Sequence, residues 1–386
     1  MDTRAPDARP LRVGLVGLGN VALGYHLPAL LDLPDLYRVV AMADPALERR
    51  EMGREQAGLT EAQVYADPLA MLERDDLDMV DLCTPQHTRR ELALAAVAPG
   101  RHLLTEKPIA TTPADARAIV EAARAAGVRL GIMHNYLFFP EVMRTLELIH
   151  DDEIGPVEVA ILNWLGCADN PGTASHRPRW RHDPSAAGGG VLMDMLHIVY
   201  LAEALLGRPI ERVSGWLHAR DPEAPVEDIA LARMEVEGGA ALVNVGWGVG
   251  PGGFAVSGHK GRIEVVYEGG GSGAFVPFER LEVHGVTGHH LERDMPSDLG
   301  MRGTLRDFAA AIALGRDPAA SGEQGLHVLE ATLAVYLAAA TGETVTLPLP
   351  EEHPVSRLGV TGLAQIDLAP WSPVRQRGIF GLGDLT

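Results

Sequence analysis

The chain has 386 residues, of which 46% are hydrophobic and 22% are charged, an ordinary composition for a globular protein and a length sufficient for two domains. Its formal net charge is −19, from 33 basic and 52 acidic residues, and such an excess repels phosphate backbones, so nucleic acid is not an expected partner. The two cysteines, Cys83 and Cys167, lack the paired spacing of a zinc site or a disulfide framework. The first residues lack the apolar stretch of a signal peptide and no segment reaches the length of a membrane span, so we expect a cytoplasmic protein without a membrane partner.

The first third of the chain alternates short apolar runs with helical stretches. The runs predict buried strands, and the stretches between them predict helices. Strands are expected at 11–17, 38–43, 79–83, 102–105 and 128–133, and helices at 22–31, 45–57, 90–97 and 113–126. This alternation predicts an α/β domain, a doubly wound parallel sheet over residues 1–134.

The pattern of predicted strands and helices changes after about residue 135. Strands are expected at 157–162, 229–236, 241–245 and 263–266, and helices at 140–150, 190–206, 302–314 and 322–339. The turn Gly238-Gly239 predicts a hairpin, and strand-rich sequence with segregated helices predicts an α+β domain on an antiparallel sheet over residues 135–347. Residues 348–386 form a tail rich in proline and glycine that packs either on the body or on a partner subunit.

The stretch Gly17-Leu18-Gly19-Asn20-Val21-Ala22 follows the first predicted strand and opens a helix. Its glycines allow a tight turn and the close approach of a pyrophosphate, whose charge is stabilised at the helix N-terminus. Asp44 ends the next strand, where a carboxylate can bind ribose hydroxyls. A glycine turn without a special role is the alternative. Asp44 would repel a 2′-phosphate, so NAD is favoured over NADP, although Arg49 and Arg50 leave NADP open.

Two further motifs follow predicted strands. Thr84-Pro85-Gln86-His87 comes after the third strand, and Thr105-Glu106-Lys107-Pro108 comes at the end of the fourth. Ligands of doubly wound sheets bind beyond the carboxyl ends of the strands. Pro108 keeps Lys107 out of helical conformation, so the lysine can hold a substrate oxygen at the strand end. Taken singly, each motif is more typical of an ordinary turn or a surface Lys–Glu pair.

A fourth motif runs from Gly188 to His197, where glycines precede an apolar helix. Asp194 and His197 are three residues apart, so we expect them on one face of that helix. A carboxylate can orient an imidazole and raise its basicity, as acid–base catalysis requires. A buried polar pair that satisfies itself explains the two residues equally well.

Together the four motifs resemble the glucose–fructose oxidoreductase / inositol dehydrogenase family (Gfo/Idh/MocA), from about Leu11 to about Leu347. Glu106-Lys107-Pro108 is the most specific mark, and Trp180–Pro184 and Val256–Gly261 also look familial. The resemblance implies a Rossmann domain, then an α/β domain with an open, mostly antiparallel sheet that serves substrate binding and oligomerisation. It also implies a nicotinamide cofactor at the strand ends and substrate between the domains.

The resemblance places the catalytic residues at Lys107, Asp194 and His197. The family's histidine usually lies four residues after the aspartate, where this chain has Ile198, so His197 is one residue early. By the same resemblance, the cofactor contacts Thr84, Pro85, His87, Glu106 and Lys107 beside the glycine loop, and the substrate cleft is faced by Asn135, Trp164, His176, Trp180 and Arg181.

These expectations describe an NAD-dependent dehydrogenase or reductase acting on a sugar, cyclitol or related polyol, and a homo-oligomer, dimer or tetramer. Either Lys107 takes the hydroxyl proton, or it polarises the oxygen while His197 takes the proton. Hydride transfer to nicotinamide needs no metal, and none is expected. One alternative is a redox-neutral enzyme that oxidises a sugar transiently to enable elimination or glycosidic cleavage. Another is a ligand sensor on the same fold, which has no need of a catalytic lysine.

Overall fold

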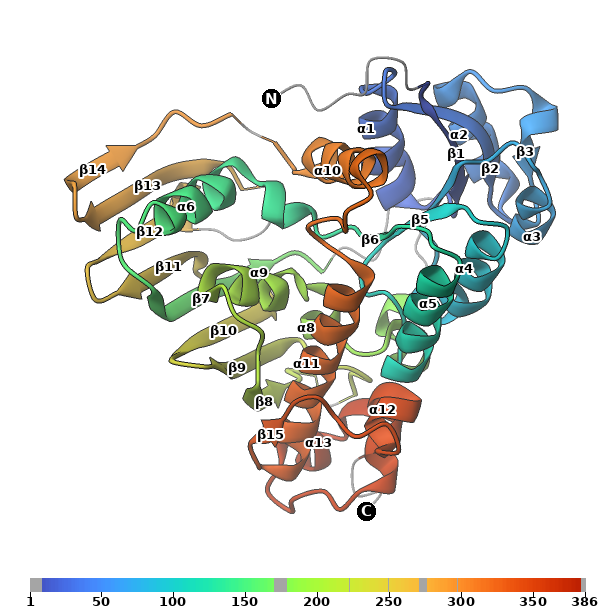
Figure 1. The fold of residues 1–386 in the computed structure, drawn as a ribbon. Helices are drawn as coiled ribbons and strands as arrows, with labels where there is room; N and C mark the ends of the chain where they lie inside the picture. The colour runs from blue at the N-terminus through green and yellow to red at the C-terminus, as the bar shows by residue number, and fades with distance from the viewer. Residues whose placement is uncertain are drawn as a thin grey trace. The chain divides into compact units, whose positions relative to one another are not determined.

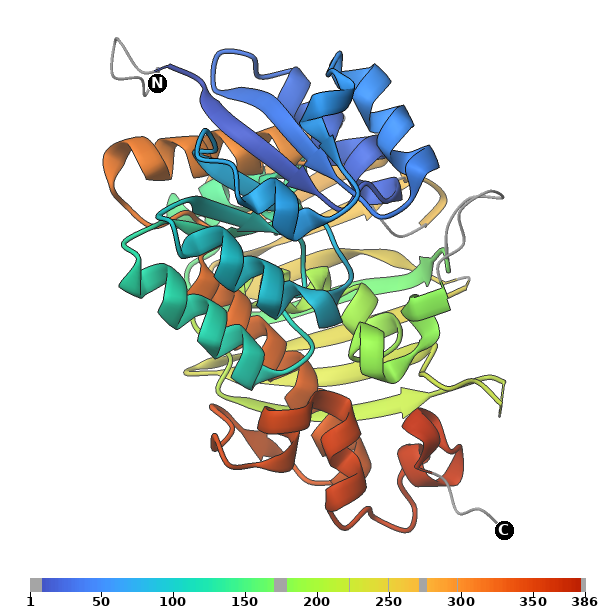
Figure 2. The same ribbon diagram turned by 90° about the vertical axis from the view of Figure 1, so that its right-hand side faces the viewer.

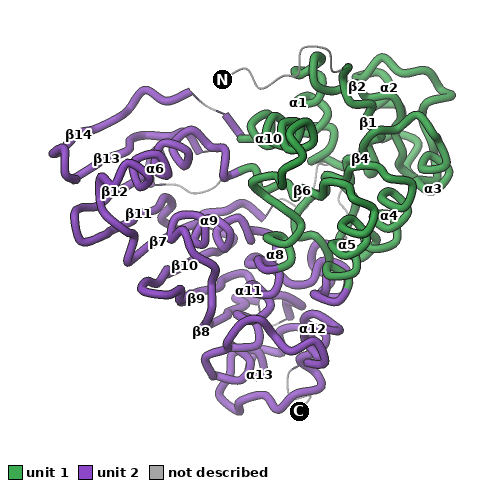
Figure 3. The backbone as a smooth tube through the Cα atoms, in the orientation of Figure 1, with its two compact units in different colours: residues 1–110, 115–135, 300–326 green, residues 111–114, 136–299, 327–386 purple. Residues whose placement is uncertain are grey.

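The computed structural model describes residues 9–169, 179–221, 223–248, 250–270, 276–296 and 298–382. The chain divides into two compact units (Figure 3). Unit 1 consists of residues 1–110, 115–135 and 300–326, and unit 2 of residues 111–114, 136–299 and 327–386. The division into 1–134, 135–347 and 348–386 expected from the sequence stays a prediction.

Unit 1 is built on a six-stranded sheet whose order is β3-β2-β1-β4-β5-β6, with all neighbouring strands parallel. The order reverses between β1 and β4, the point at which ligands of doubly wound sheets bind. The strands are β1 (Leu11–Val16), β2 (Tyr37–Ala43), β3 (Val64–Tyr65), β4 (Met79–Leu82), β5 (His102–Thr105) and β6 (Leu130–Ile132). The strands predicted in this part of the chain are confirmed; β3 was not predicted, because two residues carry no periodic pattern.

Helices cover the sheet of unit 1, as Figure 1 and Figure 2 show. Helix α1 packs against α2, and α3 packs against α4. The helices are α1 (Leu27–Leu31), which continues a π-helical turn (Ala22–His26), α2 (Leu47–Ala57), α3 (Pro68–Leu72), α4 (Arg89–Val97) and α5 (Pro113–Ala125). A buried cluster of five side chains packs around the loop after β1 and the π-helical turn that follows it. Its members are Leu15, Leu18, Leu23, Leu27 and Met42.

Helix α10 (Met301–Leu314) belongs to unit 1 although it lies far away in the sequence. It packs against α1, and the Tyr37 hydroxyl donates a hydrogen bond to the Leu305 carbonyl at 2.6 Å. Phe308 is buried where β6 has Gly131, and a Cβ at that glycine would lie 2.8 Å from the Phe308 ring. A helix that follows most of unit 2 in the sequence therefore packs on the parallel sheet of unit 1.

Unit 2 is built on a nine-stranded sheet of order β14-β13-β12-β11-β7-β10-β9-β8-β15. Its paired strands are antiparallel except for β7 and β10, which pair in parallel. The predicted hairpin is confirmed by β9 and β10. The strands are β7 (Val157–Cys167), β8 (Arg212–His218), β9 (Ile229–Val236), β10 (Gly239–Trp247), β11 (Gly252–Gly258), β12 (Gly261–Tyr267), β13 (Phe278–Gly285), β14 (Gly288–Glu292) and β15 (Val345–Thr346).

Helices of unit 2 pack on one face of its sheet, where α9 contacts β7 and β10. The tail expected after residue 347 contains two short helices. The helices are α6 (Pro140–His150), α7 (Pro184–Ala187), α8 (Val191–Asp194), α9 (His197–Leu206), α11 (Gly322–Thr341, which begins in unit 1), α12 (Pro354–Leu358) and α13 (Pro373–Gln376). A Rossmann-like parallel sheet plus a mostly antiparallel second sheet confirms the predicted fold class.

One predicted helix is wrong. The stretch 190–206 is not continuous but breaks at Met195 and Leu196 into α8 and α9. Met195 has φ −104° and ψ 31°, outside helical values, and the chain is bent by 48° there. Asp194 therefore ends one helix and His197 begins the next, so the expected single helical face does not exist.

In the described part of the chain, no single helix has both the length and the apolar composition needed to cross a membrane. The bent pair 184–194 and 197–206 passes that test only when its two helices are taken together.

Candidate functional site

The glycine loop of unit 1 lies where β1 ends, beside the end of β4. Gly17 has a φ of 83°, and a Cβ there would lie 2.9 Å from both the Cys83 backbone and the Thr84 side chain. Only glycine fits such a conformation and such an approach. A Cβ at Gly19, by contrast, would meet no heavy atom within 4 Å. The loop thus packs tightly on β4 and leaves room at Gly19, as a pyrophosphate cradle requires.

The Asp44 carboxylate closes this loop from the end of β2. It accepts a hydrogen bond from the Leu18 N–H at 2.7 Å. Buried Arg49 donates to the Leu18 carbonyl at 2.7 Å and to the Asn20 side chain at 3.2 Å. Arg50 donates to the Asp44 carbonyl at 2.7 Å. Arg49 and Arg50, the two arginines that kept NADP possible as a cofactor, therefore hold the glycine loop and the end of β2.

Sequence reasoning missed Arg89, which is 3% exposed at the start of α4. Its guanidinium donates to the Thr84 carbonyl at 2.9 Å, to the Glu106 carbonyl at 2.5 Å and to the Pro108 carbonyl. Burial lowers the pKa of Arg89 to about 10, so it is charged at neutral pH. One buried cation thereby fixes the backbones that follow β4 and β5, including the segment that carries Lys107. No motif marks Arg89, because its partners are carbonyl groups.

The residues predicted after β4 lie in a short turn before α4. Thr84 is buried, and its hydroxyl accepts a hydrogen bond from the Thr88 hydroxyl at 3.0 Å. Pro85 is half-buried and His87 is exposed. Thr84 packs on Gly17, so this turn and the glycine loop form one surface within unit 1.

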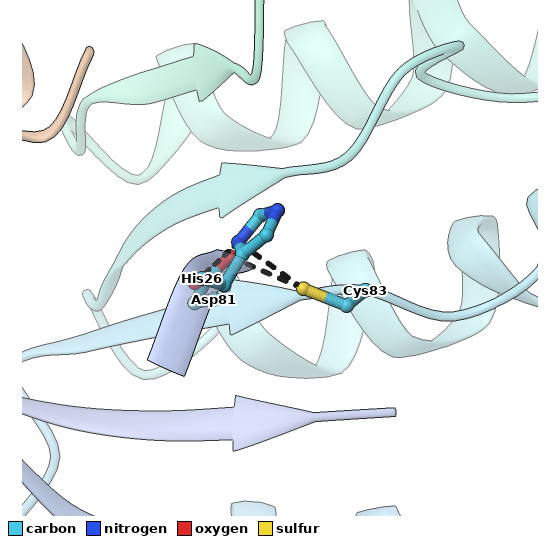
Figure 4. Close-up of side chains that lie close together, drawn as sticks. All are labelled: His26, Asp81 and Cys83. Carbon is cyan, nitrogen blue, oxygen red and sulfur yellow. Dashed lines mark hydrogen bonds and ion pairs between the residues drawn. The ribbon is translucent and has the colours of Figure 1, made fainter. Parts of the chain in front are cut away.

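His26, at the end of the π-helical turn, was also missed. Its Nδ1 lies 2.9 Å from an Asp81 carboxylate oxygen and 3.3 Å from the Cys83 sulfur (Figure 4). Its Nε2 lies 2.9 Å from the Glu106 carboxylate, whose other oxygen accepts the Lys107 backbone N–H at 2.9 Å. Glu106, predicted as a cofactor contact, thus has both oxygens engaged within unit 1. A histidine four residues after Ala22, beside acids on β4 and after β5, is the only sequence signal.

Opposite charges in this cluster shift the titration of His26 and Glu106. Burial is the largest single influence and lowers the pKa of His26, but the charges and hydrogen bonds of Asp81 and Cys83 together outweigh it and raise the pKa well above its usual value. Burial would raise the pKa of Glu106, but the hydrogen bond and charge of His26, together with the charges of Lys107 and Arg89, more than offset this and lower it. His26 is therefore an imidazolium between two carboxylates at neutral pH.

In unit 2, Asp194 ends α8 and pairs with Arg181, whose Nη1 lies 2.7 Å from the carboxylate. Both side chains are about one-quarter exposed, 24% and 26%. The guanidinium of Arg181 lies 5.6 Å from the centre of the Trp180 ring, a cation–π distance. Three predicted site residues are thus brought together.

His197 begins α9 and is buried, with 7% exposed. Its Nδ1 lies 2.7 Å from the Tyr200 hydroxyl, and its ring stacks on Tyr136 at 4.0 Å between centres. Trp164 on β7 lies near Tyr136, at 6.4 Å between ring centres. The imidazole is thus oriented by tyrosines, partners that the spacing of Asp194 and His197 did not predict.

Sequence reasoning also missed Glu227, which is fully buried and holds the start of α8. Its carboxylate accepts the backbone N–H of Gly190 at 2.9 Å and of Leu192 at 3.0 Å, and the Tyr336 hydroxyl at 2.8 Å. Burial raises its pKa to about 7. A Cβ at Gly190 would lie 2.2 Å from the Glu227 carbonyl, so the glycine is needed for this contact.

The remaining predicted residues are placed as follows. Asn135 is buried and is the last residue of the segment 115–135 of unit 1. Lys107 is half-buried in unit 1, whereas Asp194 and His197 belong to unit 2. His176 lies outside the described residues.

Known proteins resemble the chain over both units. Residues 11–134 match the Gfo/Idh/MocA oxidoreductase family model, described as an NAD-binding Rossmann fold, and residues 146–347 match the model of its C-terminal alpha/beta domain. A levoglucosan dehydrogenase of Pseudarthrobacter phenanthrenivorans is 28% identical over 72% of this chain and 72% of its own length. Inositol 2-dehydrogenase 4 of Saccharopolyspora erythraea is 33% identical over 68% of this chain and 72% of its own length.

Solved structures agree with these matches. The aldose-aldose oxidoreductase of Caulobacter crescentus superposes with a TM-score of 0.77 at 26% identity, covering 88% of this chain and 100% of that one. The glycine loop, the Glu106-Lys107-Pro108 segment and the open second sheet all fall inside the matched regions. The chain therefore belongs to the Gfo/Idh/MocA family of oxidoreductases, and residues 11–134 form its NAD-binding Rossmann domain.

Proposed function

We propose that the protein is an NAD-dependent dehydrogenase or reductase that moves a hydride between the nicotinamide and a secondary alcohol or ketone of a sugar, cyclitol or related polyol. Two relatives are named for levoglucosan and inositol, which are cyclic polyols, and both are dehydrogenases. An acidic protein of charge −19 suits an uncharged polyol better than a highly phosphorylated substrate.

The described residues of unit 1 fit an NAD molecule. Gly17 shapes the loop and Gly19 leaves the space that a pyrophosphate needs. We propose that Asp44 binds ribose hydroxyls, and the engagement of Arg49 and Arg50 with the loop and strand end favours NAD over NADP. When bound, NAD supplies the acceptor or donor of the hydride. The residues proposed to hold it are Gly17, Gly19, Asn20, Val21, Asp44, Thr84, Pro85, His87, Glu106 and Lys107.

The observation that carries the proposal is the fixing of Lys107 beside the glycine loop. Arg89 ties the segment after β5 to the turn after β4, and that turn packs on Gly17. The lysine backbone is held at the carboxyl end of the sheet, where a doubly wound fold binds its ligands. We propose that the Lys107 amine contacts the reacting oxygen. It either takes the hydroxyl proton itself or, as an ammonium, polarises the oxygen while His197 takes the proton.

In unit 2 we propose that Asp194 and His197 complete the catalytic set, with Arg181 orienting Asp194 and Tyr200 orienting His197. Trp164 is 2% exposed, and its indole nitrogen makes no hydrogen bond among the described residues. Since a buried N–H is costly to leave unpaired, a substrate hydroxyl is a suitable acceptor for it. The residues proposed to bind substrate are Asn135, Trp164, His176, Trp180 and Arg181.

We further propose that the protein is a cytoplasmic homo-oligomer, dimer or tetramer. Strand pairing puts a row of exposed apolar side chains on one face of the unit 2 sheet. This face, called the open face below, carries Val159, Ile161, Trp216, Leu231 and Leu242, each at least 36% exposed. Large exposed apolar patches commonly mark association surfaces.

A panel of cyclic polyols tests the proposed reaction, with NADH absorbance followed on purified protein. We expect at least one polyol to reduce added NAD stoichiometrically. Conversion of a polyol without net NADH would support the redox-neutral alternative instead. Tight polyol binding with neither redox change nor product would support the sensor.

A further inference from the structure

Three ionisable side chains, Asp81, His26 and Glu106, contact one another in series next to Lys107. They come from three separate segments of unit 1. Asp81 on β4 lies 2.9 Å from one nitrogen of His26, and Glu106 lies 2.9 Å from the other. The side chains of His26 and Asp81 are 0% exposed and that of Glu106 is 12% exposed. Glu106 then accepts the Lys107 backbone N–H. This series of contacts therefore runs from the sheet interior to the segment carrying the proposed catalytic lysine.

His26, Asp81 and Cys83 also have the residue types of a metal site, and their ligand atoms lie within 4.8 Å of one another. The distances fit hydrogen bonding better. Ligands of a tetrahedral zinc ion, each about 2.0–2.1 Å from the metal, lie about 3.3 Å apart, whereas His26 and Asp81 are separated by 2.9 Å. Burial raises the pKa of Cys83 to about 12, which keeps the protonated thiol rather than the thiolate that binds metals.

Attraction between opposite charges helps to stabilise the cluster in the buried interior. Asp81 and Glu106 are two acids, and His26 bridges them as a cation. A buried carboxylate without such a partner takes up a proton. Removing His26 therefore removes the strongest of the favourable interactions that keep Glu106 ionised.

Two other cations, Lys107 and Arg89, also lower the pKa of Glu106 by their charge, each less than His26 does. Arg89 from α4 contributes charge, but it donates to the Glu106 carbonyl and not to the carboxylate. His134, after β6, is neutral, because burial lowers its pKa to about 3. Tyr37 on β2 interacts with the charge of Asp81 and is protonated, since burial raises its pKa far above neutral pH.

We propose that His26 is a positioning residue for catalysis: by bridging Asp81 and Glu106, it keeps a fixed negative charge and a hydrogen-bond acceptor against Lys107. This rests on the role proposed above for Lys107. Glu106 holds the lysine backbone, and its charge favours the ammonium form of the lysine side chain at a given pH. His26 therefore sets both where Lys107 lies and at which pH its amine becomes free to act.

The test uses two variants of the full-length protein, His26→Gln and Glu106→Gln. The second keeps shape and a hydrogen-bond acceptor while it removes the charge. We measure single-turnover hydride transfer against pH. We also measure, without nucleotide, the pH dependence of Lys107 acylation by mass spectrometry. In both variants we expect the acylation midpoint to move to lower pH, and transfer to fall by about 10²-fold, as expected for a displaced reacting group.

Cys83→Ala is the matched control, because it removes a neighbour of His26 without breaking the path to Glu106. We expect it to keep the parent acylation midpoint. If His26→Gln does not fold, Glu106→Gln carries the test. Parent acylation midpoints and parent transfer rates in the folded variants would overturn the proposal. Loss of transfer on treatment with a chelator would also overturn it, because a metal would then explain the cluster.

Lys107→Ala separates this inference from the proposed function. If that variant transfers hydride at the parent rate, the function assigned to Lys107 fails. If it is inactive while His26→Gln and Glu106→Gln behave like the parent, only the role of His26 fails.

Discussion

The two halves of the proposed site are held in different ways. In unit 1, the glycine loop, the turn after β4 and the segment around Lys107 follow three strands of one parallel sheet, and each is a short continuous motif. In unit 2, Asp194 and His197 lie on two short helices. Two of their supports, Arg181 and Glu227, come from separate segments, whereas Tyr200 lies on the same helix as His197.

This difference explains why sequence motifs predict one half better than the other. A residue that follows a strand of a doubly wound sheet has its position fixed by topology. A residue on a four-residue helix has its position fixed by whichever distant groups satisfy the helix end. Substitutions at Lys107, Asp44 and Glu227 test these two kinds of support.

The largest expected effect is at Lys107. Lys107→Ala should lower single-turnover hydride transfer by about 10²–10⁴-fold, because one removed acid–base group costs that much. NAD affinity, followed by fluorescence, should change little. Lys107→Arg should also fail, since arginine does not release its proton at working pH. Parent-like transfer by folded, NAD-saturated Lys107→Ala would move the chemistry to Asp194 and His197.

Next comes Glu227, the distant support of α8. Glu227→Ala leaves two backbone N–H groups and the Tyr336 hydroxyl unpaired in the interior, and should lower the free energy of unfolding by about 3 kcal/mol. Tyr336→Phe removes one hydroxyl, which also accepts the Met193 N–H, and should cost about 2 kcal/mol. Urea denaturation measures both. Equal stabilities of Glu227→Ala and the parent would show that α8 is held by packing alone.

Glu227 also predicts a pH effect. Its pKa is raised from 4.5 to about 7 by burial, so between these values the folded protein binds a proton that the unfolded chain has released. Stability must therefore fall as pH rises through this window. Glu227→Gln, which is neutral throughout, should show a flatter dependence of Tm on pH between about 5 and 7. An unchanged slope would assign the pH dependence to other groups.

A smaller effect is expected at Asp44, where the support is local. Asp44→Ser should reduce the preference for NAD over NADP by about tenfold, because it removes the charge that repels a 2′-phosphate while a hydroxyl can still accept the Leu18 N–H. The kcat/KM values for the two cofactors measure this. A parent enzyme that prefers NADP would contradict the assignment.

The smallest effect is expected on the open face of unit 2, which no motif marks. Leu242 is 44% exposed, and Leu242→Ser should weaken self-association by about 1 kcal/mol per copy if that residue is buried in an oligomer. Light scattering across a concentration series measures the shift. Leu314→Ser is the matched control, since Leu314 is 61% exposed on α10, which belongs to unit 1. A parent that is monomeric at micromolar concentration would refute the oligomer.

Much of the fold was predictable from the sequence, because strands and helices of ordinary length have a characteristic spacing of apolar residues. The boundaries of α6 were predicted, and the turn Gly238-Gly239 predicted the hairpin of β9 and β10. Short or polar elements such as β3 and β14 were not predicted, because a few residues establish no period. The break between α8 and α9 falls in an apolar run without proline or glycine, so no residue near Met195 predicts where the helix ends.

The candidate site divides in the same way. The positions of Gly17, Asp44 and Lys107 were predictable because each follows a strand, and their roles in the site stay predictions. Arg89 and Glu227 were not predictable, since they act on backbone carbonyl and N–H groups that every residue possesses. A buried charge whose partner is the main chain leaves no pattern of residue types in the sequence.

The return of α10 to unit 1 has a consequence for synthesis of the protein. The parallel sheet is complete in sequence at β6, but its covering segment, residues 300–326, emerges from the ribosome only after most of unit 2. At about 5–20 residues per second, the surface around Tyr37 and Gly131 stays uncovered for roughly 10–40 s. The nascent NAD-binding domain therefore exposes apolar surface to chaperones during that interval, and a fragment that stops at residue 135 carries the same exposed surface permanently.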